Sequence, residues 1–428
     1  MRKYKIGILT LGCSKNTVDS ERLAGQLKNN NFRIVEDPNK ADIVIINTCG
    51  FIGDAKEESV NSILNAVEMK KQGKLKKVIV SGCLSQRYGE ELKKEIPEVD
   101  MFFGVEQYAG ILKGLGGELK SELLGERLLS TPRHYAYMKI SEGCNQSCSF
   151  CAIPLIRGKH VTYTKERLMS EAMHLSSQGV KELILIGQDT TDYGIDLYGR
   201  RCLAELIDDF SGIPGVEWIR LLYAYPSHFP KDVIDVLANN NKFCKYIDMP
   251  LQHISDGILK SMRRGITSKR TRELVGALKE RVPGLALRST FIVGYPGETD
   301  KDFRELCDFV TETRFDRIGV FKYSPEEDTH SYTMNDMDEN IKDERLDILM
   351  NLQKDISYEN NQKMLGRKMK VIIDDMEGNY YVARSERETP EVDGEILIDN
   401  DQDIRIGSFY EAEITDCNEY DLFGRILK

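Results

Sequence analysis

Short runs of hydrophobic residues alternate with amphipathic stretches through most of the chain. In the N-terminal part these runs cover residues 6–11, 43–46 and 78–80, and each is almost uniformly apolar, as in a strand of a parallel sheet buried on both faces. The clearest helical pattern covers 55–71, where Asp54 and Glu57 have capping-box spacing. The alternation predicts an N-terminal parallel α/β domain over residues 1–120.

The same alternation continues through residues 130–360 and then changes. Strands are expected at 135–140, 182–186, 218–222, 246–248, 287–293 and 317–321, with helices at 165–178, 267–281 and 299–313. Six strand–helix units predict a partial, TIM-like (βα)6 barrel with its chemistry at the C-terminal ends of the strands. Beyond a helix at 342–364, short strands with polar turns predict a small β-barrel over residues 362–428.

The distribution of charge narrows the choice of partners. The net charge is −10, and residues 365–428 contribute −8 of it, with 8 Lys and Arg against 16 Asp and Glu. An acidic barrel should repel a phosphate backbone and attract a basic protein, although the acid could also serve only solubility. We therefore expect no direct nucleic-acid binding.

The N-terminus, residues 1–12, faintly resembles a signal peptide, but its apolar part is too short and polar residues follow at once. No apolar run approaches the roughly 18 residues of a membrane helix. We expect a cytoplasmic protein that makes no membrane contact. Its ten cysteines then point to reduced thiols or metal ligands and not to disulfides.

Cys144, Cys148 and Cys151 form a C-x3-C-x2-C motif, which is the strongest signal in the chain. One short loop thus supplies three thiolates and no local fourth. An iron–sulfur cube held by three thiolates keeps one iron open for a substrate or cofactor, whereas structural metal sites are usually closed by four protein ligands. A zinc site completed by His160 or a distant cysteine remains an alternative.

Cys13, Cys49 and Cys83 each follow one of the three N-terminal apolar runs. Because the C-terminal ends of parallel strands lie on one edge of a sheet, we expect the three thiols to converge there, near helix N-termini that favour negative charge. They predict a second cluster with an open iron; the alternative is three small buried hydrophobes. We expect structural roles for the other four: Cys202, Cys244, Cys307 and Cys417.

Later strand ends carry further distinctive residues. Gly294 and Gly297 would let the backbone approach a ligand, although glycine often serves only a turn. His253 is either a surface residue or a hydrogen-bonding group in a pocket. The basic run 263–272 is expected to be mostly a solvated helix face.

These features together resemble the radical S-adenosylmethionine (SAM) methylthiotransferase family over essentially the whole chain. That family combines a three-cysteine N-terminal domain, a radical SAM partial barrel and a C-terminal TRAM domain. Residues 12–16 (Gly-Cys-Ser-Lys-Asn), 47–52 and 248–253 are similar to its branch that modifies an aspartate of small-subunit ribosomal protein twelve, although Ser14 stands where proline is common. The Gln-Met-Asn of the tRNA-modifying branch is absent after Cys13.

The resemblance implies two [4Fe-4S] clusters, held by the two cysteine sets, and two SAM molecules. One SAM would donate a methyl group to a sulfur on the N-terminal cluster. The other would yield the radical that removes hydrogen from the aspartate Cβ, which then collects methylthio. Phe150, Gln188 and Gly294 would line the SAM pocket.

The resemblance also implies an electron donor and a basic ribosomal protein as partners, with nucleic acid met only through the ribosome. We expect a monomer, because no long heptad or apolar oligomer stripe is evident. Two other functions remain open: a tRNA adenosine methylthiotransferase, and a non-catalytic iron–sulfur or zinc scaffold.

Overall fold

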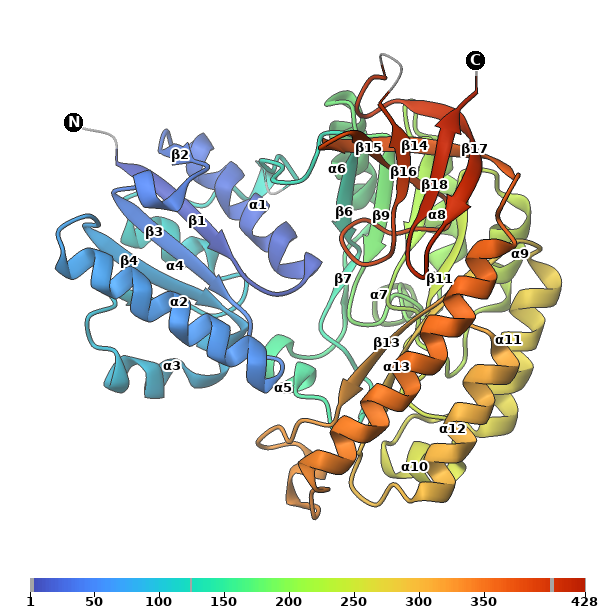
Figure 1. Cartoon of the computed structure of the whole chain (residues 1–428). Helices are drawn as coiled ribbons and strands as arrows, with labels where there is room; N and C mark the ends of the chain where they lie inside the picture. The colour runs from blue at the N-terminus through green and yellow to red at the C-terminus, as the bar shows by residue number, and fades with distance from the viewer. Residues whose placement is uncertain (1–3, 124, 401–403, 428) are drawn as a thin grey trace.

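The computed structural model describes residues 4–123, 125–400 and 404–427, which form three units in chain order (Figure 1). The first is an α/β sheet, the second an open parallel sheet of six strands and the third a closed β-barrel. This confirms the fold class predicted from the sequence. No helix within these described ranges is long and apolar enough to cross a membrane.

The N-terminal domain is an all-parallel sheet in the order β2-β1-β3-β4-β5. One apolar layer joins the sheet to α2 and α3, and another joins its opposite face to α1 and α4. Both faces are therefore covered, as the uniformly apolar runs predicted. The elements are β1 (Lys5–Thr10), α1 (Ser14–Asn29), β2 (Arg33–Val35), β3 (Ile43–Thr48), α2 (Gly53–Lys71), β4 (Lys77–Gly82), α3 (Cys83–Glu95), β5 (Met101–Phe102) and α4 (Tyr108–Gly114).

The predicted cap of α2 is wrong. The helix begins at Gly53, and Ile52 at its N-cap makes no side-chain hydrogen bond. Asp54 instead lies in the first turn, where its negative charge favours the positive end of the helix dipole. The capping-box spacing of Asp54 and Glu57 therefore arises from an acidic first turn and not from a cap.

The central domain is a parallel sheet in the order β13-β12-β11-β10-β9-β6, left open between its two edge strands. Alternate residues of β6 face opposite sides: Ala136 and Met138 join the helical layer, while Tyr135 and Tyr137 face the concave interior. The strands are β6 (Tyr135–Lys139), β9 (Glu182–Ile186), β10 (Trp218–Leu221), β11 (Phe243–Asp248), β12 (Ala286–Val293) and β13 (Arg317–Lys322).

Helices cover the convex face of this sheet, and smaller elements lie at the strand ends (Figure 1). The main helices are α6 (Lys165–Ser177), α8 (Leu203–Ser211), α9 (Lys231–Asn239), α11 (Ser268–Arg281) and α12 (Asp300–Thr313). The smaller elements are β7 (Ser141–Glu142), α5 (Ile153–Arg157), β8 (Val161–Thr162), α7 (Ile195–Tyr198) and α10 (Asp256–Ser261). This arrangement confirms the predicted partial barrel.

Helix α13 (Glu339–Gln362) packs along β13 and leads into the C-terminal barrel. The barrel closes in the order β14-β15-β16-β18-β17 around its own apolar core. Its strands are β14 (Lys368–Glu377), β15 (Tyr380–Ser385), β16 (Ile396–Asp399), β17 (Phe409–Cys417) and β18 (Leu422–Ile426).

The C-terminal barrel packs against the N-terminal ends of the central strands. Arg220 Nε donates to Glu182 Oε1 at 2.7 Å, and Arg384 Nη2 donates to Glu182 Oε2 at 2.9 Å, so one buried carboxylate holds a guanidinium from each domain. In the loop after β15, Glu391 accepts hydrogen bonds from Tyr135 and Tyr137. Some acidic side chains of the C-terminal domain therefore bind the central domain and are not free to meet a partner.

Candidate metal and cofactor site

The three N-terminal cysteines lie at the same edge of their sheet. Cys13 is the N-cap of α1, Cys83 is the first residue of α3, and Cys49 directly follows β3. A Cβ built on Gly12, where φ is +87°, would lie 2.8 Å from Cys49 Sγ, so only glycine allows two of these strand ends to pack so closely. The convergence expected from the parallel topology is present.

The second set lies in the loop between β7 and α5, beyond the C-terminal end of β6. Arg264 Nη1 donates to Cys148 Sγ at 3.2 Å, and the hydroxyl of Tyr225 lies 3.6 Å from the same sulfur. The backbone N–H of Gln146 points at Cys144 Sγ at 3.4 Å. Hydrogen-bond donors directed at sulfur suit thiolates that bind a metal cluster.

Burial raises the pKa of Cys83, Cys144 and Cys151, each to about 12. These thiols are desolvated and need a nearby cation, such as iron, to stay ionised at neutral pH. Three cysteines at each site, with donors aimed at Cys83, Cys144 and Cys148, fit a four-iron cluster that keeps one iron free of protein ligands.

Cys13 differs from these thiols. Burial alone would raise its pKa, but the positive charges of Lys15 and Arg157 outweigh burial and lower it. Lys15 and Arg157 thus bring positive charge to Cys13, which suits a thiolate that binds a cluster of net negative charge.

His160, the alternative zinc ligand, lies beside the second cysteine set but faces other groups. Its Nε2 is 3.3 Å from Thr162 Oγ1 and 3.8 Å from a carboxylate oxygen of Asp196. No hydrogen bond joins its ring to a cysteine sulfur in the part of the chain that the structure describes. These contacts give no support to a zinc site that includes His160.

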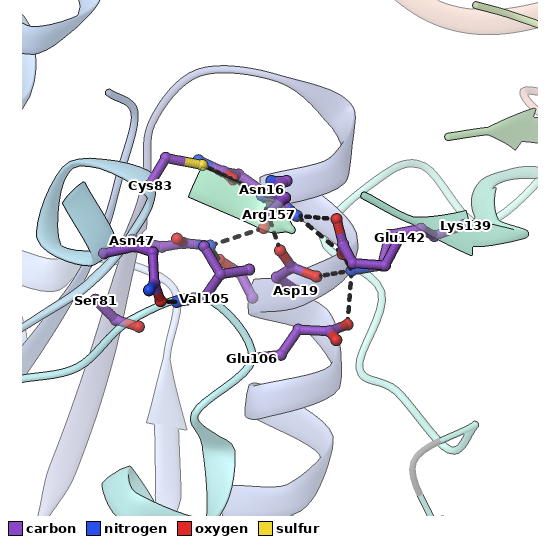
Figure 2. A network of polar contacts seen from close by, with 12 residues as sticks. Asn16, Asp19, Asn47, Ser81, Cys83, Val105, Glu106, Lys139, Glu142 and Arg157 are labelled. Carbon is purple, nitrogen blue, oxygen red and sulfur yellow. Dashed lines mark hydrogen bonds and ion pairs between the residues drawn. The ribbon is translucent and has the colours of Figure 1, made fainter. Parts of the chain in front are cut away.

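A buried ring of alternating charges lies between Cys83 and Glu142, which stands two residues before Cys144; Figure 2 shows the ring with Cys83. Lys139 binds Asp19 and also Glu142, the latter at 2.6 Å. Arg157 binds the same two carboxylates, Asp19 Oδ2 at 3.1 Å and both oxygens of Glu142 at 3.0 Å. Although burial opposes ionisation, Lys139 and Arg157 hold the pKa of Glu142 well below its usual range.

This ring shows how a cation holds several acidic groups together. Carboxylate oxygens of Asp19, Glu106 and Glu142 lie within 4.8 Å of one another. Lys139 Nζ contacts all three, and its side chain is fully buried. The ammonium group and the guanidinium of Arg157 together balance two of the three negative charges, so the acidic cluster is a salt-bridge network between the N-terminal and central domains.

Two residues expected in the SAM pocket lie close to the second cysteine set. Phe150 is half-buried and packs against an apolar group that includes Met262, Tyr295 and Tyr323. Gln188 Nε2 donates to Glu142 Oε1 at 2.7 Å, which connects it to the charged ring. Both follow C-terminal ends of the central strands, the edge at which such a barrel binds its ligands.

Gly294 has a packing requirement of its own. Its φ is +71°, and a Cβ at this position would lie 2.4 Å from Cγ of Lys342 in α13. At Gly297 a Cβ would meet no atom within 4 Å. The close neighbour that requires glycine at 294 is therefore a side chain of the protein, and a contact of Gly294 with SAM stays a prediction.

Sequence reasoning missed several side chains of the site. Arg157 bonds to Cys83 across 74 residues, and Arg264 bonds to Cys148 across 116 residues. Arg264 belongs to the basic run expected to be mostly solvated, and it is buried instead. The sequence left the place of His253 open; it is fully buried, and its Nδ1 accepts from the N–H of Ser255.

Comparisons with known proteins divide the chain in the same way. Residues 5–104 match the Uncharacterized protein family UPF0004, residues 138–310 match the Radical SAM superfamily, and residues 365–427 match the TRAM domain. The ribosomal protein uS12 methylthiotransferase RimO of Cytophaga hutchinsonii is 51% identical over 100% of this chain and 99% of its own length. The chain belongs to the RimO family of radical SAM methylthiotransferases.

Other RimO proteins match almost as well. That of Flavobacterium johnsoniae is 51% identical over 99% of this chain and 98% of its own, and that of Bacteroides thetaiotaomicron is 49% identical over 100% and 99%. Membership of this family makes the chain an enzyme and implies SAM and a [4Fe-4S] cluster as cofactors. The tRNA-modifying alternative is not favoured.

Solved structures support the fold. The radical SAM methyltransferase TsrM of Kitasatospora setae is 14% identical with a TM-score of 0.55, covering 77% of each chain. The radical SAM enzyme OxsB is 14% identical with a TM-score of 0.52, covering 83% of this chain and 56% of its own. At this level of identity the likeness concerns architecture alone.

Proposed function

We propose that this enzyme transfers a methylthio group to the β-carbon of an aspartate in ribosomal protein uS12. The observation that carries the proposal is the pair of three-cysteine sites on facing strand ends, in a chain that aligns over its full length with uS12 methylthiotransferases. Two open-iron clusters with SAM would supply the radical and the sulfur, chemistry that side-chain acids and bases lack.

The protein's own side chains have three tasks in this reaction. Cys144, Cys148 and Cys151 would hold the cluster that binds SAM, and Cys13, Cys49 and Cys83 would hold the auxiliary cluster. Phe150, Gln188 and Gly294 are proposed to line the SAM pocket. The buried side chains of Asp19, Lys139, Glu142 and Arg157 are proposed to hold the two cysteine sites in place relative to each other.

Exposed acids on the C-terminal barrel support a basic protein as substrate. Glu377, Glu395 and Asp399 are exposed, and in the strand pairing Glu377 and Asp399 both lie opposite Tyr380 of β15. Burial, together with the neighbouring charges of Glu377 and Asp421, raises the pKa of Glu395. Neighbouring carboxylates of like charge form a negative patch suited to a cationic surface.

Further partners follow from this function. The enzyme requires an electron donor to reduce the cluster that binds SAM. We propose that it acts as a monomer in the cytoplasm, where ribosomal proteins are found, and that it meets nucleic acid only through the ribosome.

The first test compares a strain that lacks the gene with its parent. Small-subunit ribosomal proteins are weighed and tRNA nucleosides are profiled in the same samples. Loss of one methylthio group from uS12, with tRNA unchanged, is the expected result. Loss of a methylthio nucleoside from tRNA instead would overturn the proposal.

The second test uses purified enzyme with SAM, a reductant and uS12. Cys144→Ala should abolish both 5′-deoxyadenosine release and methylthiolation, whereas Cys13→Ala should still cleave SAM but should leave uS12 unmodified. Retention of SAM cleavage by Cys144→Ala would contradict the assignment. Failure of the wild-type enzyme to form deoxyadenosine would favour a scaffold without catalysis.

A further inference from the structure

Arg157 is the last residue of α5 and lies six residues beyond Cys151. Its side chain is only 2% exposed and extends from the central domain into the N-terminal domain (Figure 2). Nη2 donates to Asn16 Oδ1 at 2.6 Å and points at Cys83 Sγ at 3.4 Å. One end of the guanidinium thus contacts the N-terminal cysteine site, which would hold the auxiliary cluster.

The other end of the guanidinium contacts the residues beside the C-x3-C-x2-C loop. Nη1 donates to both oxygens of Glu142, which stands two residues before Cys144. Glu142 is fixed in turn by Lys139 and by Gln188. A continuous path of hydrogen bonds therefore runs from Cys83 through Arg157 to the backbone that carries the C-x3-C-x2-C loop.

We propose that Arg157 is a positioning residue that fixes the two cysteine sites relative to each other and directs a cationic hydrogen bond onto the Cys83 sulfur. The inference rests on the proposed two-cluster function. A positive donor at a cluster sulfur stabilises the reduced, more negative state of the cluster and helps to retain its iron.

Arginine is suited to this place because of its shape. Its planar group carries five N–H donors in fixed directions and can serve a carboxylate, an amide and a sulfur at once. A lysine ammonium is a single point charge and cannot reach Glu142 and Cys83 together with the same geometry. The charge alone should therefore restore only part of the effect of Arg157.

Arg22 provides a matched control. Its side chain is fully buried and crosses the same domain boundary, with Nη2 donating to Glu171 Oε2 at 3.2 Å. Its hydrogen bonds go to Glu171 and Tyr163 and not to a cysteine. If Arg157 served only to join the domains, replacing either arginine should have the same consequences.

The experiment uses the full chain with Cys144, Cys148 and Cys151 changed to alanine, so that only the auxiliary cluster is present. Into this parent Arg157→Gln, Arg157→Lys and Arg22→Gln are introduced separately. Reduction of the cluster is followed by electron paramagnetic resonance in a potentiometric titration, and iron release to a chelator is timed. Circular dichroism verifies that each variant is folded.

Arg157→Gln should shift the reduction equilibrium at least tenfold toward the oxidised cluster, about 59 mV for one electron. It should also speed iron release 10- to 100-fold, with Arg157→Lys between it and the parent. Arg22→Gln should change neither. Equal shifts in Arg157→Gln and Arg22→Gln, or none in either, would overturn the inference. A parent that binds no iron would instead refute the auxiliary cluster and the proposed function.

Discussion

Glu298 is a buried carboxyl group whose surroundings raise its pKa to about 7. Burial is the main cause, and Arg345, whose Nη1 donates to Glu298 Oε1 at 3.0 Å, offsets only part of it. The folded protein therefore keeps this proton at pH values where the unfolded chain, with a pKa near 4.5, has lost it. The resulting stabilisation is complete below pH 4.5 and is lost as the pH rises through 7.

Glu298→Gln should remove this pH dependence. Over this range the free energy of unfolding of the wild type should fall by about 3 kcal/mol more, at most, than that of the variant. Melting temperatures measured across the range would show the difference. Asp300→Asn is the control, since Asp300 binds the same Arg345 at 2.7 Å but is 86% exposed. An unchanged slope in Glu298→Gln would contradict the assignment.

At the residue scale, spacing along the chain was enough to select the six cysteines as candidate ligands, because one set follows three successive strands and the other lies in a single loop. It was not enough for Arg157 and Arg264. Their importance comes from sulfur atoms 74 and 116 residues away, and a basic residue on a short helix or turn gives no local sign of such a contact. Burial of a guanidinium depends on the tertiary structure that supplies its acceptors.

Among the elements, the junction between β12 and α13 depends on Gly294. Gly294→Ala should destabilise the enzyme by about 1–3 kcal/mol, because alanine is strained at φ +71° and its Cβ would press on Lys342. Gly297→Ala shares the positive φ but meets open space, so it should cost less. Thermal melting ranks the two variants. If Gly294→Ala instead weakened SAM binding without lowering the melting temperature, contact with SAM would be its main role.

The N-terminal domain is also fastened by the segment after β13. Glu326 is almost fully buried and accepts from Lys56 Nζ of α2 at 3.0 Å and from Arg87 Nη1 of α3 at 2.6 Å. Glu326→Gln removes the charge that both cations face, and breaking a buried pair in this way costs about 3–5 kcal/mol. We expect faster hydrogen exchange in α2, α3 and residues 324–333.

Glu327→Gln is the matched control for this junction. Its side chain accepts one hydrogen bond, from Tyr88 at 3.1 Å in an exposed position, and should be nearly silent. Equal exchange in both variants would mean that the backbone around Glu326, and not its carboxylate, fastens the domain.

Most elements could be predicted because hydrophobic periodicity reports burial directly. Four strands were missed, and each has only two or three residues: β2 and β5 at the edges of the N-terminal sheet, and β7 and β8, which pair with each other. A strand so short has too few alternating positions to show a period. The start of α2 was misplaced because an acidic first turn and a capping box can share one spacing.

For the whole molecule, the parallel topology of the two sheets explains why the two cysteine sites lie next to each other. Each parallel sheet presents its strand C-termini at one edge, and the ring around Lys139 and Arg157 connects those two edges. The composition predicted that the C-terminal barrel is acidic. It did not predict which of the acidic side chains bind other parts of the molecule and which stay exposed. Asp374 and Glu391 bind His134 and Tyr137 of the central domain, and only the remaining exposed acids can meet a partner.

Those exposed acids should govern how fast a basic substrate arrives. Neutralising Glu377, Glu395 and Asp399 together should slow association with uS12 about tenfold at low salt and leave kcat unchanged, because charges at the edge of an interface act on encounter. Stopped-flow binding across ionic strengths measures this, and the difference should vanish at high salt. Neutralising Glu90, Glu91 and Glu95 on α3 changes the net charge equally and should have little effect. If both triple variants slowed association equally, net charge and not the barrel surface would be responsible.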